Sequence, residues 1–458
     1  MTNPFGRVLG MTFDNKVIRE PTTNGSGLIF AAMGGGKTTC GTVPAVQAML
    51  ADTQQAIFLN DVKDGEVAAQ IGDMCVKYGR RFGVVDEFEV LGANYPYRIS
   101  LNPLSAALNA KPDHLPFLID NFSHALIAEP PDDQKNFYWR DEPRGFADAA
   151  TRIVLDHSPR LATPGGIASL LSDPETWQSA LELEASDPDS PNRLAAARIL
   201  DLKRFNAEHY AQHHRAAVSA LRIFSHPPLS EAGRYATVTH EELIRDHWIV
   251  CFVNPLRYAD RIGPSFALHY LSLMDAQLSG KAGRSMWILD EYCNAPLREP
   301  VTRITAFRAY GLRCLYITQS RLDSVRRYGE RETAILEENC TVKQWLKFSN
   351  FEEAERVSRA MGESLNVSHG LGMNAEQSGY TGSLSTGRDR LFTPYELMSL
   401  PDDEQIIHVA GIGFIHARKI RQNEIAPTCF DLADNPLEGG RLPPNPKVTL
   451  PVPPRRKP

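Results

Sequence analysis

The chain has 458 residues, of which 42% are hydrophobic and 23% charged, and its formal net charge is −6. This composition excludes a fibrous, disordered or disulfide-stapled protein, and the length suits two or three globular units. No apolar run is long enough for a membrane-spanning helix, and the first residues do not have the pattern of a signal peptide. Seven cysteines without a CxxC pair are typical of a reducing compartment. We therefore expect a cytoplasmic protein.

The first 104 residues have the pattern of an α/β unit. Short apolar runs at residues 27–32, 55–60 and 82–86 predict three strands. A glycine cluster and a helix-compatible segment at residues 38–52 separate the first run from the second. Alternation of strands and helices is typical of a parallel sheet. Residues 1–104 are therefore expected to be the first part of an α/β domain.

The pattern of apolar residues changes after residue 104. Residues 105–235 combine helical apolar spacing with proline and glycine breakers, which predicts an inserted all-helical domain. Strand-like runs then resume within residues 236–425, which we assign to the second part of the α/β domain. These runs lie at residues 247–253, 285–289, 313–318, 342–348 and 405–409.

Two segments lack such patterns. Residues 366–387 are rich in glycine and serine without apolar periodicity, which predicts a mobile loop. Residues 426–458 form a proline-rich C-terminal tail, and we expect its last 25 residues, which contain eight prolines, to be extended and unpacked.

The segment Ala31-Ala-Met-Gly-Gly-Gly-Lys-Thr38 matches the phosphate-loop pattern GxxxxGK[ST] except at its first position. Backbone N–H groups of the glycine run can surround phosphate oxygens, Lys37 would reach the β/γ-phosphates, and Thr38 would bind Mg²⁺. A flexible glycine turn is the alternative, which the position between a strand and a helix disfavours. The pattern predicts ATP and Mg²⁺ as cofactors, with nucleotide contacts at Met33, Gly34, Gly35, Gly36, Lys37, Thr38 and Thr39.

Two further strand ends carry candidate catalytic groups. The run at residues 285–289 ends in Asp290, which would hold Mg²⁺, and Glu291, which would orient and deprotonate the attacking water. Gln319 ends another strand and would sense the γ-phosphate, although a polar strand cap is the alternative. Arg308 precedes it on an expected helix. With the glycine loop, these residues predict a nucleoside triphosphatase.

Net acidity confines any nucleic-acid contact to a local basic surface. Residues 298–331 contain eight arginines and only three acids. A solvated helix face is the ordinary interpretation of such a run, and contact with DNA is the alternative. The arginines are Arg298, Arg303, Arg308, Arg313, Arg321, Arg326, Arg327 and Arg331.

The ordered motifs resemble those of the type IV secretion coupling proteins, the motor ATPases of conjugation. The resemblance spans about residues 25–425 and includes Asn60-Asp-Val-Lys-Asp-Gly-Glu66 and Asn102-Pro103-Leu104. Its other segments are residues 137–140, 290–291, 311–313, 319–320, 328–329, 391–397, 400–405 and 417–419.

This resemblance implies a RecA-like P-loop NTPase fold, with a mostly parallel sheet flanked by helices and an inserted all-α domain. It also implies a homo-hexamer that hydrolyses ATP and delivers DNA, or a relaxase–DNA substrate, to a type IV secretion channel. Arg308 falls where the family carries an arginine finger into the neighbouring subunit's site. Ala31 and the inserted Asp64 depart from the family motifs.

The family usually begins with transmembrane helices, which this sequence lacks. The resemblance therefore indicates a soluble variant, attached peripherally to the inner membrane, if at all, through a separate anchor. Two other functions stay open: a nucleotide-binding receptor that recruits protein effectors, and a soluble DNA-translocating ATPase of a mobile element or defence system. The intact Lys37, Thr38, Asp290, Glu291 and Gln319 favour a working ATPase.

Overall fold

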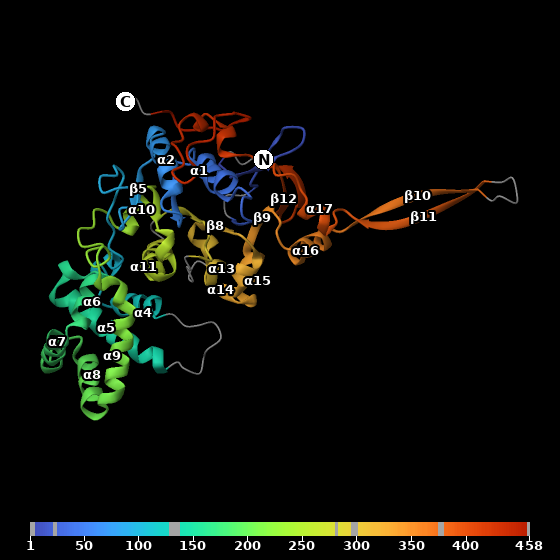
Figure 1. The fold of residues 1–458 in the computed structure, drawn as a ribbon. Helices are drawn as coiled ribbons and strands as arrows, with labels where there is room; N and C mark the ends of the chain where they lie inside the picture. The colour runs from blue at the N-terminus through green and yellow to red at the C-terminus, as the bar shows by residue number, and fades with distance from the viewer. Residues whose placement is uncertain are drawn as a thin grey trace.

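The computed structural model describes residues 5–21, 25–127, 138–279, 283–294, 301–373 and 380–455. Within them, an eleven-stranded sheet has the order β2-β1-β13-β12-β9-β3-β8-β7-β4-β6-β5. Helices cover the sheet, and a helical region lies at one end of the molecule (Figure 1). A long hairpin projects from the body near α16 and α17, away from the helical region. None of the helices described has the length and hydropathy that a membrane crossing requires.

The central part of this sheet is parallel, which confirms the predicted fold class. Its strands are buried apolar runs because helices cover both faces, and this is why the sequence pattern located them. In the described residues they are β3 (Ser26–Ala31), β4 (Gln55–Asp61), β5 (Phe82–Val85), β6 (Ile249–Val253), β7 (Arg284–Leu289), β8 (Leu312–Thr318) and β9 (Cys340–Lys347).

Antiparallel strands extend the sheet beyond β9. The sequence pattern predicted one of them, and the others are short or amphipathic runs that it did not identify. In the order of the sheet they are β12 (Glu404–Val409), β13 (Gly413–Arg418), β1 (Val8–Met11) and β2 (Val17–Arg19).

A buried ionic triad joins the N-terminal strands to the parallel sheet. Glu20 accepts Arg7 Nη2 at 2.9 Å and Arg313 Nη1 at 3.0 Å, and all three side chains are at most 2% exposed. Arg313 also donates to Gln55 Oε1. This arginine is therefore a structural partner of the sheet and does not belong to any exposed basic surface.

Two hydrophobic layers enclose the sheet. On one face it packs against α1 (Val43–Met49) and α2 (Glu66–Lys77). The other face packs against α11 (Ala259–Leu278) and shorter helices. The other helices that the structure describes outside the helical region are α10 (His240–Arg245), α13 (Ile304–Phe307), α14 (Arg321–Tyr328), α15 (Glu330–Asn339), α16 (Phe351–Met361) and α17 (Pro394–Met398).

The described residues between 105 and 235 form helices and no strand. Phe146 and Trp177 from this region belong to the same core as Phe58 and Phe252 of the sheet. Because the core is continuous, the domain boundaries at residues 104 and 235 stay predictions. The helices are α3 (Ser105–Leu108), α4 (Leu115–Leu126), α5 (Tyr138–His157), α6 (Pro164–Ser172), α7 (Pro174–Ser186), α8 (Arg193–Phe205) and α9 (Ala207–Leu221).

The mobile loop predicted at residues 366–387 is wrong. Residues 366–373 and 380–387 lie in an antiparallel hairpin of β10 (Glu363–Met373) and β11 (Tyr380–Arg390), paired in register from Glu363↔Arg390 to Met373↔Tyr380. Residues 374–379 of the predicted loop lie outside the described residues. Glycine and serine disfavour strands individually, but Leu365, Val367, Leu371 and Met373 recur with a period of two. The backbone hydrogen bonds between the two strands outweigh the low strand propensity of glycine and serine.

The C-terminal tail is packed, contrary to the prediction. β14 (Ile425–Ala426) pairs in parallel with β15 (Val448–Thr449), and Leu432 and Leu450 are buried. Asn435 Nδ2 donates to Glu66 Oε1 of α2 at 2.8 Å. Prolines keep the chain extended between the apolar residues, so that these residues pack in succession against the rest of the protein.

Candidate active site

The site lies at the carboxyl edge of neighbouring parallel strands. β8 is between β3 and β7 in the sheet, so the ends of all three meet at one edge. The glycine loop follows β3, Gln319 follows β8, and Asp290 and Glu291 follow β7. Ligands of open α/β sheets bind beyond this edge.

The glycines have the backbone angles that a phosphate loop requires. Gly34 and Gly36 have φ of 70° and 88°, in the left-handed region that glycine adopts without strain. The Gly35 N–H donates to Ala32 O at 2.8 Å, so this amide closes the loop and does not face a phosphate. Met33 is 84% exposed at the tip. Lys37 then begins a π-helical segment, Lys37–Thr42, which leads into α1.

Lys37, Glu291 and Gln319 meet in the structure. Lys37 Nζ is 2.7 Å from Glu291 Oε1, and the two side chains are 9% and 4% exposed. Gln319 Nε2 donates to the same oxygen at 3.4 Å, and Asn294 Nδ2 donates to Glu291 Oε2 at 3.4 Å. Sequence reasoning missed Asn294, although its spacing of three residues from Glu291 was visible.

Asp290 has the properties of a metal ligand. It is buried, and its Oδ2 accepts the Thr42 hydroxyl at 3.2 Å. Its Oδ1 is buried without a hydrogen-bond partner among the described residues, which leaves an oxygen for a cation. Burial raises the pKa of Asp290 to about 6, and the nearby Lys63 ammonium opposes this shift. A carboxylate oxygen and the hydroxyl of Thr38, at the start of the same loop–helix junction, are the kind of ligands that Mg²⁺ takes.

The motif after β4 contributes one supporting group and one charged group. Asp61 accepts the backbone N–H groups of Val67 and Ala68 at 2.9 and 2.8 Å, so it caps the start of α2. Burial lowers the pKa of Lys63, but the nearby carboxylates outweigh this effect and raise that pKa above its ordinary value. They belong to Asp290, Glu66, Glu291 and Asp61. β4 is the neighbour of β7, which brings Lys63 to the side of the acids opposite the glycine loop.

Arg308 does not lie with these residues. It is exposed on the 3-10 turn Arg308–Tyr310, before β8 begins, whereas Gln319 follows the end of this strand. The seven residues of β8 span about 23 Å at 3.3 Å per residue, so Arg308 lies at the opposite edge of the sheet.

The other arginines of the basic run differ in their surroundings. Arg321 pairs with Glu330 and Glu337, and Asp323 accepts the Ser320 hydroxyl. The described residues therefore offer no ion pair to Arg326 and Arg327, which are exposed at the end of α14. Arg303 and Arg331 are also exposed, and Arg298 lies outside the described residues.

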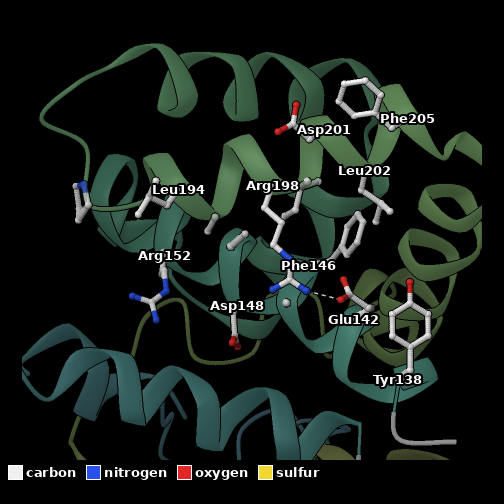
Figure 2. A pocket seen from close by; sticks show the side chains of 15 residues that line it. Tyr138, Glu142, Phe146, Asp148, Arg152, Leu194, Arg198, Asp201, Leu202 and Phe205 are labelled. Atoms are coloured by element: carbon white, nitrogen blue, oxygen red, sulfur yellow. Dashed lines mark hydrogen bonds and ion pairs between the residues drawn. The ribbon is translucent and has the colours of Figure 1, made fainter.

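A separate cleft lies in the helical region. It has a volume of about 630 Å³ between α5 and α8, and its lining includes Phe146, Leu194 and Leu202. Figure 2 shows Glu142 and Arg198 pointing toward each other across it and forming an ion pair. None of the nucleotide-site residues lines this cleft.

The family model described as "Type IV secretory system Conjugative DNA transfer" matches residues 11–435. No curated protein matches the chain.

Solved structures of a bacterial conjugative coupling protein share the fold. The unbound monoclinic form of TrwBdeltaN70 has a TM-score of 0.68 at 13% identity, covering 90% of this chain and 89% of that one. TrwB in complex with the ATP analogue ADPNP has a TM-score of 0.65 at 12% identity and covers 92% and 90%. TrwB in complex with ADP and Mg²⁺ has a TM-score of 0.63 at 12% identity and covers 90% and 88%.

Proposed function

Because the chain belongs to the type IV secretory system conjugative DNA transfer family, we propose that it is an ATP-hydrolysing motor. It couples a DNA or relaxase–DNA substrate to a type IV secretion channel and drives the translocation of that substrate. The observation that carries the proposal is the 2.7 Å contact between Lys37 Nζ and Glu291 Oε1, beside Gln319 and Asp290. These are the groups that phosphoryl transfer to water requires.

The residues divide the chemistry among them. The glycine loop and Lys37 bind the phosphates, and Thr38 and Asp290 hold Mg²⁺, which neutralises phosphate charge when it is bound. ATP draws the Lys37 ammonium away from Glu291, whose carboxylate then takes a proton from the attacking water. Gln319 donates toward the same position and responds to the γ-phosphate. The complexes of TrwB with ADPNP and with ADP and Mg²⁺ support these ligands.

Assembly into a homo-hexamer brings Arg308 of one subunit to the nucleotide site of its neighbour, which has no such arginine of its own among the described site residues. Arg308 is exposed at the edge of the sheet opposite its own Lys37 and Glu291. Such an arginine contributes to catalysis only in a neighbouring subunit's site, where its planar charged group stabilises the transferring phosphoryl group.

The DNA path includes the end of α14. Arg326 and Arg327 are exposed there without ion pairs in the described residues, and α14 begins two residues after Gln319. A change at Gln319 on loss of the γ-phosphate therefore reaches these arginines through one short helix. Secretion-system components, a relaxase and a separate membrane anchor complete the proposed set of partners.

ATP hydrolysis measured with and without DNA tests the proposal. We expect turnover that single- or double-stranded DNA stimulates, and no turnover in the Lys37→Ala variant, which lacks the ammonium aimed at the phosphates. Turnover that survives in Lys37→Ala would show that another protein or site is responsible. ATP binding without hydrolysis and without any response to DNA would favour the receptor for protein effectors.

A further inference from the structure

A buried lysine lies behind the glycine loop. Lys419 follows β13 and is 6% exposed, and its Nζ is 2.9 Å from Asp402 O and 3.5 Å from Gly35 O. In the described part of the chain no carboxylate forms an ion pair with it, because the Asp402 carboxylate binds Lys347 instead. Burying an ammonium whose only partners are carbonyl groups lowers the stability of the fold. Such a residue is therefore expected to serve another purpose in the molecule.

The contact with Gly35 determines which way the next amide points. In a trans peptide the carbonyl and the following N–H point in opposite directions. Lys419 holds the Gly35 carbonyl on the buried side of the loop, so the Gly36 N–H points away from Lys419. Gly36 has φ of 88° and directly precedes Lys37, so this amide belongs to the concave side, where phosphate oxygens are expected.

The charge of Lys419 also favours phosphate binding by the loop. An ammonium bound to a carbonyl polarises that peptide group and strengthens its N–H as a donor. A buried charge is also screened by salt much less than an exposed one. The loop thus has a fixed positive charge behind it, in addition to the mobile charge of Lys37 in front.

We propose that Lys419 is a positioning residue of the nucleotide site, which orients the Gly35–Gly36 peptide and gives the loop affinity for the phosphate chain of a nucleoside triphosphate. This inference rests on the proposed function, because it assumes that the loop binds nucleotide. Its effect grows with phosphate charge, so ATP depends on Lys419 more than ADP does.

A structural role alone makes a different prediction. Lys419 Nζ also donates to the Asp402 carbonyl at 2.9 Å, and a purely structural side chain would only secure this segment. Loss of such a role would lower the unfolding temperature and weaken ATP and ADP binding equally. Comparing the two nucleotides therefore separates positioning from support.

The experiment measures equilibrium binding of fluorescent ATP and ADP analogues, with Mg²⁺, to the full chain, to three variants of Lys419 and to one control variant, together with the unfolding temperature. Lys419→Met should lose about 10- to 100-fold in ATP affinity, the range for one hydrogen bond to a charged group, and less in ADP affinity. Lys419→Gln retains a donor without the charge and should fall between Lys419→Met and the unchanged chain. Lys419→Arg should restore most of the preference for ATP.

Lys447→Met is the matched control. Lys447 also belongs to the C-terminal part, but its ammonium pairs with Glu424 at 2.6 Å and is 46% exposed. This variant should bind both nucleotides as the unchanged chain does.

The outcomes distinguish this inference from the proposed function. If the unchanged chain binds neither analogue, the proposed function fails. If it binds them and Lys419→Met binds them equally well, the inference is wrong and the proposed function stands. Equal losses for ATP and ADP with a lower unfolding temperature also overturn the inference. Should Lys419→Met not fold, Lys419→Gln and Lys419→Arg decide by the same comparison.

Discussion

Replacing Glu291 with glutamine separates two roles of this carboxylate. In the structure it holds Lys37 at 2.7 Å in a site where both side chains are buried. The phosphates of ATP require the same ammonium, so ATP competes with Glu291 for Lys37. Glutamine keeps the size of the side chain but has no negative charge for Lys37 and cannot accept the proton of the water. We therefore expect Glu291→Gln to bind ATP more tightly and hydrolyse it more slowly.

The contact between Lys37 and Glu291 determines the expected change in ATP affinity, and the role of Glu291 as general base determines the expected change in rate. A hydrogen bond to a charged group contributes about 1.5–3 kcal/mol, and about 1.4 kcal/mol is a factor of ten in affinity. Removing the competition should lower the Kd for ATP by about tenfold, and by about 100-fold at most. A general base contributes about 10²–10⁴-fold in rate, so hydrolysis should fall by that factor.

Two measurements check the prediction. Titration with a fluorescent ATP analogue gives the Kd, and single-turnover hydrolysis gives the rate without the complication of product release. Asp290→Asn is the matched control, since it also removes one buried negative charge beside the loop. It should weaken ATP binding in Mg²⁺, because it removes a proposed metal ligand.

Two results would contradict the prediction for Glu291→Gln. A Glu291→Gln protein that hydrolyses ATP at the normal rate would show that Glu291 is not the base. Slow hydrolysis with unchanged or weaker binding would show that the Lys37–Glu291 pair does not oppose ATP, and the competition argued from the 2.7 Å contact would be wrong.

Three further changes test other parts of the molecule. Arg308→Ala should bind ATP normally but lose turnover, since arginine fingers contribute about 10³–10⁵-fold, and mixing it with Glu291→Gln subunits should restore part of the activity. A loss below about tenfold would contradict the finger. Arg326→Glu combined with Arg327→Glu should weaken DNA binding and reduce the slope of log affinity against log salt by about 0.7–0.9 for each lost phosphate contact. An unchanged slope in a variant that still hydrolyses ATP would remove this pair from the DNA path. Glu20→Gln leaves two buried arginines without a carboxylate and should lower the free energy of unfolding by about 3–5 kcal/mol in urea titration. A change below about 1 kcal/mol would mean that the triad is worth no more than a surface pair.

Local patterns in the sequence predicted the parallel strands, which the structure confirms, and the residues that we propose for the nucleotide site. Each buried strand is a short apolar run, and the glycine loop is one continuous segment between a strand and a helix, so both are local patterns. The positions of Asp290, Glu291 and Gln319 also followed from local patterns, because Asp290 and Glu291 come one after the other behind one such run and Gln319 comes directly after another. Parallel strands end at one edge, so these residues were expected to meet.

The contacts of the charged residues could not be predicted from local sequence patterns and are seen only in the folded structure. Arg313 and Arg326 belong to the same basic run, yet one is buried against Glu20 and the other is exposed, because burial depends on which strands become neighbours. Lys419 reaches Gly35 across 384 positions of sequence, and the proline-rich tail packs on α2 through Asn435. Such contacts join segments whose local patterns contain no information about each other, so their partners are set by the packing of the whole chain.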